Sequence, residues 1–184
     1  FLLYLPPEPS PHRRSRPIVP FRKVLGGILY RLRTGCQWKA IPAEFGSGST
    51  CHLRFQEWQG LKVFEQIWAH QLRAYDQKRG IGWNWQSLDS ATIPAPLGGT
   101  KTGKNPVDRA KSGSKRNVLV DRRGVPLALT IAAANKQDYQ CADELLHHLV
   151  IRRSWHDRIG QRAVLHLCGD KGYDFDEVYQ VAQR

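Results

Sequence analysis

The sequence lacks methionine altogether, and its 184 residues include only four cysteines: Cys36, Cys51, Cys141 and Cys168. No two of these cysteines form a Cys-x-x-Cys pair, so the sequence does not predict a zinc knuckle. They are widely spaced and lie mostly near apolar residues, so we expect buried free thiols in a reducing cytoplasm rather than disulfides. Methionine is missing even at position 1, and we expect a chain that begins, and also ends, away from natural boundaries.

Long apolar runs are also absent. No run approaches the roughly 18 residues that a membrane-spanning helix requires. Residues 1–5 are too short for the apolar core of a signal peptide, and no basic segment precedes them. The sequence therefore predicts neither a membrane span nor an export signal.

Acidic residues are scarce: 16 Asp and Glu stand against 28 Lys and Arg, which gives a formal net charge of +12 at pH 7. The basic excess is densest in residues 1–60. Such a surface favours a polyanionic partner, with nucleic acid first, and a merely soluble basic protein is the alternative. Because 41% of the residues are apolar, we expect a folded protein with a core.

The N-terminal part predicts an arm followed by short helices. Residues 6–20 hold six prolines and several arginines, which favours an extended, solvated arm that either follows a DNA backbone or is a disordered linker. Residues 21–80 carry apolar residues at helical spacing, with glycines between the segments, which predicts three or four helices. One face of the first helix is expected to hold Phe21, Leu25, Ile28, Leu29 and Leu32.

This predicted bundle resembles a helix-turn-helix DNA-binding domain, although any small helical domain gives a similar pattern. Residues 38–45 suit a short helix broken near Pro42, and the turn at residues 46–48 precedes a helix that Ser49 or Thr50 can cap. Arg31 and Arg33 lie away from the apolar face and are candidate DNA contacts.

The C-terminal part, residues 83–184, predicts elements in the order β-β-β-α-β-α. The expected strands are residues 85–93, 115–120, 125–134 and 163–168, and the expected helices are residues 141–152 and 175–184. Residues 121–124 read as a hairpin turn with a glycine at positive φ, so the second and third strands pair antiparallel. The crossover helix allows the fourth strand to lie parallel beside the first. The predicted fold class is α/β, with a mixed sheet after the helical bundle.

A polar loop, residues 98–113, joins the first two strands and carries four basic residues: Lys101, Lys104, Arg109 and Lys111. Its start matches the GxxxxGK part of a P-loop. However, Asn105 lacks the Mg²⁺-binding hydroxyl, and Pro106 interrupts the helix that should follow. We therefore expect either a DNA-contacting loop or a mobile surface loop.

Two aspartates stand at the predicted sheet. Asp170 directly follows the fourth strand and lies between Gly169 and Gly172, and Asp89 lies in the first strand. An α/β fold presents metal-binding acids at the carboxyl ends of its strands. If the first and fourth strands are neighbours, Asp89 and Asp170 come together as the candidate catalytic and metal-binding pair.

With these residues identified, the chain resembles bacterial insertion-sequence transposases of the DDE type, in the IS-five-like group. The resemblance covers residues 21–184. The matching segments follow the family's order and are residues 27–38 (GILYRLRTGCQW), the Asp89 strand, 101–109 (KTGKNPVDR), 113–121, 124–127 (GVPL), 134–138 (ANKQD) and 170–174 (DKGYD).

The resemblance implies an RNase H-like catalytic fold that cleaves and transfers DNA strands at insertion-sequence ends. In such enzymes three carboxylates hold two Mg²⁺ or Mn²⁺ ions, which activate water or a 3′-hydroxyl and stabilise the leaving oxygen. Asp89 matches the first family aspartate and Asp170 the second. The resemblance also implies double-stranded DNA (terminal inverted repeats and target DNA) as partner, a homo-oligomer on paired ends, and a place with the nucleoid in the bacterial cytoplasm. Further candidate DNA contacts are Lys115, Arg116 and Lys171, the last being equally a surface lysine.

The family's third carboxylate has no match. That Glu follows a Tyr-x-x-Arg-x-x-x-Glu pattern on a later helix, and the 14 residues after Asp170 contain only Glu177, expected as a solvated helix residue. We therefore expect a C-terminally truncated chain that binds metal weakly and is weak or inactive alone. The alternatives are a DNA-binding regulator or relic that occupies transposon ends without catalysis, and an RNase H-type nuclease unrelated to transposition.

The other acidic residues have structural expectations. Asp121 is expected to serve its turn, Asp174 to cap the last helix, and Asp108 to pair with Arg109. Asp138 is expected to cap a helix, although it is near enough to the site to support the metal ligands.

Overall fold

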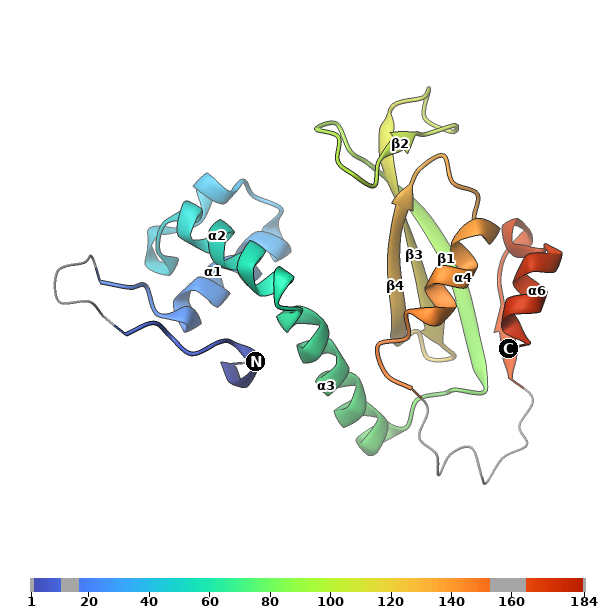
Figure 1. Cartoon of the computed structure of the whole chain (residues 1–184), viewed down its shortest axis with the longest axis horizontal. Coiled ribbons are helices and arrows are strands. Elements are labelled where there is room, and N and C mark those ends of the chain that lie inside the picture. The colour runs from blue at the N-terminus through green and yellow to red at the C-terminus, as the bar shows by residue number, and fades with distance from the viewer. Residues whose placement is uncertain (1, 11–16, 153–164, 184) are drawn as a thin grey trace. The chain divides into compact units, whose positions relative to one another are not determined.

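The structure is a computed structural model that describes residues 2–10, 17–152 and 165–183 (Figure 1). The chain forms two compact units, residues 1–70 and residues 71–184. In the described part of the chain, no helix is both long and apolar enough to cross a membrane.

The first unit is a set of helices around one apolar core. Its elements in chain order are η1 (Leu2–Tyr4), α1 (Phe21–Thr34), η2 (Trp38–Ala40), η3 (Ala43–Phe45), α2 (Gly48–Gly60) and the start of α3 (Val63–Arg79). Trp58 of α2 is fully buried and meets the ring of Phe21 edge-on, with ring centroids 5.3 Å apart. The segment around Pro42 forms two short 3-10 turns, which fits the expected break.

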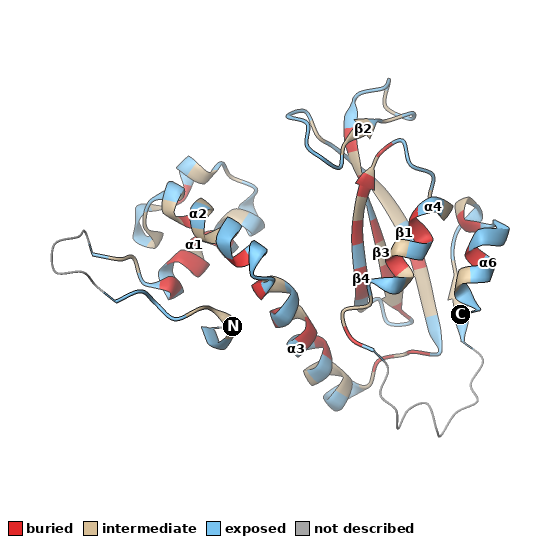
Figure 2. Cartoon of the chain, viewed as in Figure 1, coloured by how far each residue is buried: buried red, intermediate tan, exposed pale blue. Residues whose placement is uncertain are grey.

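The buried face of α1 differs from the expected one at two positions. Phe21, Leu25 and Ile28 are buried together with Val24, whereas Leu29 and Leu32 are 48% and 56% exposed. Figure 2 shows that α1 carries both buried and exposed residues. The buried residues follow the i, i+3, i+4, i+7 spacing of one helical stripe. Leu32 falls on the same stripe one turn later, and its exposure shows that the packing ends before that turn.

The start of α2 corrects a second expectation. Ser47, and not Ser49 or Thr50, caps the helix, because Ser47 Oγ accepts the N–H of Thr50 at 3.1 Å. The helix begins at Gly48, where a side chain would overlap the carbonyl of Trp38. The close approach of η2 therefore requires a glycine at this position.

The described residues of the N-terminal arm contact the first unit, which differs from the expected solvated arm. Glu8 Oε1 accepts the N–H of Phe21 at 2.6 Å, at the start of α1. Tyr4, Leu5 and Val19 pack against the core. The three arginines of the arm, Arg13, Arg14 and Arg16, lie outside the described residues.

The second unit is a five-stranded mixed sheet with helices beside it. The strands are β1 (Trp85–Pro94), β2 (Gly103–Lys104), β3 (Ser112–Asp121), β4 (Pro126–Ala133) and β5 (His166–Cys168). β3 pairs antiparallel with β1, β2 and β4, and β5 pairs parallel with β1. α4 (Tyr139–His147) lies against β3 and β4 and beside α6 (Asp176–Ala182) (Figure 1). The unit is therefore mixed α/β, as predicted, and the expected antiparallel hairpin is confirmed.

Several element boundaries differ from the expected ones. The expected loop at residues 98–113 contains β2 and the first residues of β3, because polar residues there pair with neighbouring strands. The helix expected at residues 141–152 ends at His147, since the chain returns to the sheet where Val150 N–H donates to Leu127 O at 3.0 Å. Of the strand expected at residues 163–168, residues 163 and 164 lie outside the described residues.

The β3–β4 turn is held by one buried carboxylate. Asp121 is 1% exposed, and its Oδ1 accepts the N–H groups of Arg123 and Val125 at 2.8 and 2.9 Å. Its Oδ2 accepts the N–H of Gly82 at 2.9 Å. Gly124 adopts a φ of 79° as expected, so Asp121 serves its turn and also ties the turn to the start of the sheet.

The four cysteines are free thiols, as predicted, but Cys36 and Cys168 are half-buried and not, as expected, buried. Cys51 and Cys141 are buried, and burial raises the pKa of both thiols. Both therefore stay protonated near neutral pH and act as small apolar side chains.

Candidate active site at the carboxyl ends of β1 and β5

Asp89 and Asp170 lie at the same level of two neighbouring strands. β1 and β5 run parallel, and their paired residues extend from Trp85 and His166 to Ser87 and Cys168. Two residues further along, the two chain segments reach Asp89 and Asp170. The parallel pairing therefore brings the Asp170 segment, just beyond the end of β5, beside the part of β1 that carries Asp89.

Both aspartates are exposed and held by short local hydrogen bonds. Asp89 Oδ1 accepts the N–H of Ser90 at 2.8 Å. Asp170 Oδ1 accepts the N–H of Gly172 at 3.0 Å, which starts the 3-10 turn η4 (Lys171–Tyr173). These bonds leave the other oxygen of each carboxylate available to a ligand.

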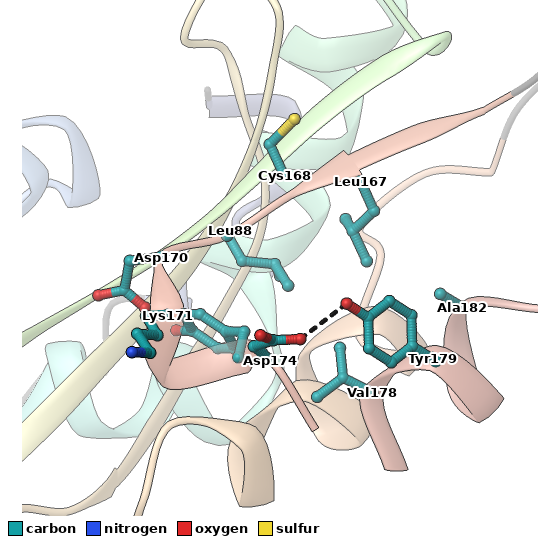
Figure 3. A pocket seen from close by; sticks show the side chains of 11 residues that line it. Leu88, Leu167, Cys168, Asp170, Lys171, Asp174, Val178, Tyr179 and Ala182 are labelled. Atoms are coloured by element: carbon teal, nitrogen blue, oxygen red, sulfur yellow. Dashed lines mark hydrogen bonds between the residues drawn. The ribbon is translucent and has the colours of Figure 1, made fainter. Parts of the chain in front are cut away.

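A hollow of about 470 Å³ lies next to Asp170, between β5 and α6 (Figure 3). Its lining is mainly apolar and includes Leu88, Leu167 and Val178. Asp174 accepts a hydrogen bond from the Tyr179 hydroxyl at 2.8 Å across this hollow. Asp174 therefore does not cap α6, whose cap position is Phe175, and the expected cap is wrong.

A third carboxylate, Asp138, stands at the same edge of the sheet. It follows β4, whose carboxyl end points the same way as those of β1 and β5 because β3 lies antiparallel to both β1 and β4. Asp138 occupies the expected cap position of α4, but its side chain makes no capping bond to the helix. Its Oδ1 instead accepts the Ser90 hydroxyl at 2.6 Å and the Lys115 ammonium at 2.7 Å.

Asp138 and Asp170 face each other across Gly172. A Cβ placed on Gly172 would lie 3.0 Å from Asp138 Oδ2 and 3.0 Å from Asp170 Oδ1. The two oxygens are therefore no further apart than twice that distance. Gly172 does not have a positive φ, so its backbone does not require a glycine. A glycine is needed because the two carboxylates occupy the space that a side chain would fill.

Tyr173 places a buried hydroxyl among these acids. The residue is 5% exposed, and its hydroxyl makes no hydrogen bond within the described chain. Burial raises the pKa of Tyr173 to about 12, and the charges of Asp138, Asp170 and Asp89 add to the rise, while the Ser90 side chain opposes it. The phenol therefore stays protonated at neutral pH and is a hydrogen-bond donor beside three carboxylates.

The donor set suits a hard divalent ion that keeps part of its water. Within residues 2–10, 17–152 and 165–183, no group of three or more His, Cys, Asp or Glu side chains is arranged to hold a metal ion. Mg²⁺ commonly binds through one or two carboxylates and retains several waters, and Asp89 and Asp170 offer two exposed carboxylates. The residues present thus fit an open, partly hydrated ion rather than a closed cage.

The basic residues predicted to contact DNA fall into two groups: exposed side chains, and side chains that interact with other residues of the chain. Seven are exposed: Arg33, Lys101, Lys104, Arg109, Lys111, Arg116 and Lys171. Of these, Lys111 lies 3.3 Å from Asp108. Asp108 therefore pairs with Lys111 and not, as expected, with Arg109. Lys101 is exposed and lies 3.7 Å from Glu144.

Two predicted contacts are not free surface cations. Lys115 is 9% exposed and donates to Asp138 and to Lys136 O, which removes it from the surface. The guanidinium of Arg31 stacks over the ring of Trp38, with its central carbon 4.7 Å from the ring centroid.

Sequence reasoning missed the grouping of Ser90, Lys115 and Tyr173 with the acids. The local signal was weak, because each is a common residue in a polar segment. Asp138 carried one usable signal: it follows a strand whose carboxyl end was expected at the same sheet edge as Asp89.

Comparison with known proteins gives consistent matches along the chain. A family model described as "Putative transposase of IS4/5 family" matches residues 2–68, and one described as "Transposase DDE domain" matches residues 86–183. The chain is 38% identical over 108 residues to "Insertion element IS402 uncharacterized 16.2 kDa protein" of Burkholderia cepacia, covering 54% of this chain and 71% of the relative.

A second relative from the same organism is "Putative transposase for insertion sequence element IS402". It is 36% identical over 77 residues, which cover 42% of this chain and 36% of the relative. The match to this relative thus spans little more than a third of its length. No solved structure matches the chain.

Proposed function

The chain belongs to the insertion-sequence transposases with a DDE domain, and from this premise we propose that it acts in metal-dependent cleavage and strand transfer of DNA at insertion-sequence ends. The observation that carries the proposal is the matched level of Asp89 and Asp170 on the parallel strands β1 and β5. We further propose that the mixed sheet, with β5 beside β1 and β4 at the far side of β3, is an RNase H-like catalytic fold.

Asp89 and Asp170 are the residues that would hold Mg²⁺ or Mn²⁺. When bound, such an ion supplies positive charge at the reacting phosphate and lowers the pKa of a bound water. The two carboxylates orient the ion at an open edge of the sheet, where a DNA phosphate has access because both side chains are exposed. Lys171, next to Asp170 and exposed, is placed to contact a phosphate of the same DNA.

We propose that the DNA backbone lies along the basic residues of the segment from β2 into β3. This segment contributes Lys101, Lys104, Arg109, Lys111 and Arg116 as exposed side chains. Within the first unit, the exposed Arg33 of α1 is a separate candidate phosphate contact. Phosphate contacts of this kind position a protein on DNA without reading its sequence. Lys115 has no place in this surface because it is buried in its ion pair.

We propose a separate role for each segment of the chain. Residues 21–80 are the proposed DNA-binding helices, with residues 1–20 as their N-terminal arm, and residues 83–184 are the proposed catalytic part. A homo-oligomer on paired transposon ends, with terminal inverted repeats and target DNA as partners, belongs to the same proposal.

A DNA-binding regulator that lacks catalysis is the second candidate. The observation that favours it is the state of Asp138, the third carboxylate at the site, whose Oδ1 is held by Lys115 and Ser90. Two available carboxylates predict weak metal binding and weak or no cleavage by this chain alone.

One experiment separates the two candidates. The 184-residue chain and its Asp89→Ala variant are incubated with duplexes that carry the terminal inverted repeats of the encoding element, with Mg²⁺, Mn²⁺ or EDTA. Cleavage by the parent chain that requires metal and disappears in Asp89→Ala supports the enzyme. Equal binding without cleavage by either chain supports the regulator. Preference for RNA–DNA hybrids over the end duplex would instead indicate a nuclease unrelated to transposition.

A further inference from the structure

Asp138 connects three elements that meet at the proposed metal site. Its Oδ1 accepts the Ser90 hydroxyl from β1 at 2.6 Å and the Lys115 ammonium from β3 at 2.7 Å. Asp138 itself lies where the chain enters α4, so one oxygen joins segments that are 48 and 23 residues away in sequence. We propose that Asp138 is a positioning residue of the proposed metal site, which fixes Asp89 through Ser90 and sets the place of Asp170 across Gly172.

The path from Asp138 to Asp89 consists of two hydrogen bonds. The Ser90 hydroxyl donates to Asp138, and the Ser90 N–H donates to Asp89 Oδ1 at 2.8 Å. Ser90 is therefore held at both its side chain and its backbone. Fixing Ser90 restricts the rotation of the Asp89 carboxylate, which is exposed and has this local hydrogen bond to hold it.

The relation between Asp138 and Asp170 is one of space and charge. Asp138 Oδ2 and Asp170 Oδ1 both lie 3.0 Å from the position of a Cβ on Gly172, so these like charges are close. Their repulsion opposes a closer approach of Asp170 to Asp138 and so limits where the Asp170 carboxylate can lie. Lys115 neutralises Asp138, so Asp89 and Asp170 supply the two negative charges that match a divalent ion.

Lys115 also argues against Asp138 as a direct ligand. Its ammonium is 2.7 Å from Asp138 Oδ1, and a divalent ion bound to the same carboxylate would be close to that positive charge. The pair is largely shielded from solvent, with the side chains of Lys115 and Asp138 11% and 25% exposed. The ion pair therefore suits a supporting role behind the ligands.

The buried Tyr173 hydroxyl also indicates that a ligand with an oxygen atom binds near Asp89, Asp138 and Asp170. It is buried and makes no hydrogen bond of normal geometry within the described chain, although the Ser90 side chain is near enough to lower its pKa, and the charges of Asp138, Asp170 and Asp89 raise that pKa. A buried donor without a partner is costly, so its hydrogen is available to an oxygen that metal or substrate brings.

This inference rests on the proposed function, and its test measures Mn²⁺ affinity of the full 184-residue chain by the loss of the free-ion electron paramagnetic resonance signal. The variants are Asp138→Ala, Asp138→Asn and Ser90→Ala. Controls with the same chemical change are Asp143→Ala on the exposed side of α4 and Ser87→Ala on β1. Circular dichroism melts establish that each variant is folded.

Asp138→Ala is expected to weaken Mn²⁺ binding by about 10-fold or more, as loss of a residue that orients metal ligands does. Ser90→Ala is expected to weaken it by roughly 3-fold or more, because only one bond of the path is removed. Asp138→Asn keeps an oxygen for Ser90 and Lys115 but leaves the Lys115 charge uncompensated, so it is expected to weaken Mn²⁺ binding, though less than Asp138→Ala does. The two controls are expected to leave the affinity unchanged.

The outcomes separate this inference from the proposed function. If the parent chain and Asp89→Ala bind Mn²⁺ equally, or neither binds, the proposed metal site fails and this inference fails with it. If binding depends on Asp89 but Ser90→Ala and a folded Asp138→Ala bind as the parent does, only the positioning role is wrong. If Asp138→Asn loses as much Mn²⁺ affinity as Asp138→Ala does, Asp138 is a metal ligand, and the positioning role is wrong. If Asp138→Ala does not fold, Ser90→Ala decides alone.

Discussion

Lys115 and Asp138 form the least exposed ion pair among the described residues, with Nζ 2.7 Å from Oδ1. Lys115 Nζ also donates to Lys136 O at 2.6 Å, so the ammonium has two partners beside the sheet. In each of the other ion pairs of the described chain, at least one of the two side chains is 41% exposed or more. The pair thus links β3 to the entry of α4, where Asp138 lies behind the candidate site.

The first prediction concerns this pair. Lys115→Met removes one partner and leaves the Asp138 charge poorly solvated, so the free energy of unfolding should fall by about 2 kcal/mol. Urea denaturation followed by circular dichroism measures the change. Lys111→Met is the matched control: its partner Asp108 is in an exposed pair, so its effect should stay below about 0.5 kcal/mol. Equal effects of the two substitutions would contradict the structural role of the buried pair.

The second prediction concerns the β3–β4 turn. Asp121→Ala removes the acceptor of three backbone N–H groups, those of Gly82, Arg123 and Val125. Because the carboxylate is 1% exposed, water does not readily replace it, and the loss should be about 3 kcal/mol or more. The same denaturation measurement applies, with Asp143→Ala as an exposed control. A cost below about 1 kcal/mol for Asp121→Ala would show that the turn holds without its carboxylate.

The third prediction concerns the glycine between two acids. Gly172→Ala introduces a methyl group 3.0 Å from Asp138 Oδ2 and Asp170 Oδ1, which must move at least one carboxylate. The backbone of Gly172 is not left-handed, so little stability should be lost. Mn²⁺ affinity should fall by about 10-fold with a nearly unchanged melting temperature. Gly60→Ala is the control, because its added methyl group meets nothing within 4 Å, and it should leave the Mn²⁺ affinity unchanged.

The fourth prediction concerns pH. The folded state raises the pKa of Tyr173 from 10.0 to about 12, mainly by burial, so the folded chain holds this proton more tightly than the unfolded chain does. The stabilisation is therefore fully present below about pH 10 and is lost as the pH rises toward 12. Free energies of unfolding at pH 8.5 to 11.5 — roughly the window set by these pKa values — should fall more steeply for the parent chain than for Tyr173→Phe. Parallel curves would contradict the burial of the phenol.

The fifth prediction concerns DNA binding by two adjacent residues of β3. Arg116 is exposed and Lys115 is buried, so only Arg116 is placed to contact phosphate. Arg116→Ala should reduce the slope of log affinity against log salt concentration by about 0.9, as loss of one phosphate contact does. Lys115→Met should leave the slope unchanged. Fluorescence anisotropy with a labelled duplex at several salt concentrations measures both, and a lower slope in Lys115→Met alone would reverse the proposed surface.

The sequence by itself determined the main strands and helices of the second unit, apart from β2, and the parallel position of β5 beside the strand that carries Asp89. Both depend on local patterns: apolar runs set the strands, Gly124 sets the hairpin, and a crossover places β5 parallel to β1. The order of short motifs along the chain also pointed to the transposase family before any contact was known. The sequence did not predict the ends of the strands, because pairing with β1 and β2 extends β3 through polar residues to Ser112.

The tertiary structure alone decided the surroundings of the two aspartates. The buried face of β3 consists of Gly113, Lys115, Asn117, Leu119 and Asp121, which is largely polar, so alternation of apolar residues could not identify it. The face is buried because α4 lies over it, and that packing gives Lys115 its carboxylate partner. Asp138 likewise stands at the cap position of α4, but its side chain bonds Ser90 and Lys115, which are distant in sequence, and does not bond the helix. Contacts between distant segments fix such roles, and local sequence patterns do not contain them.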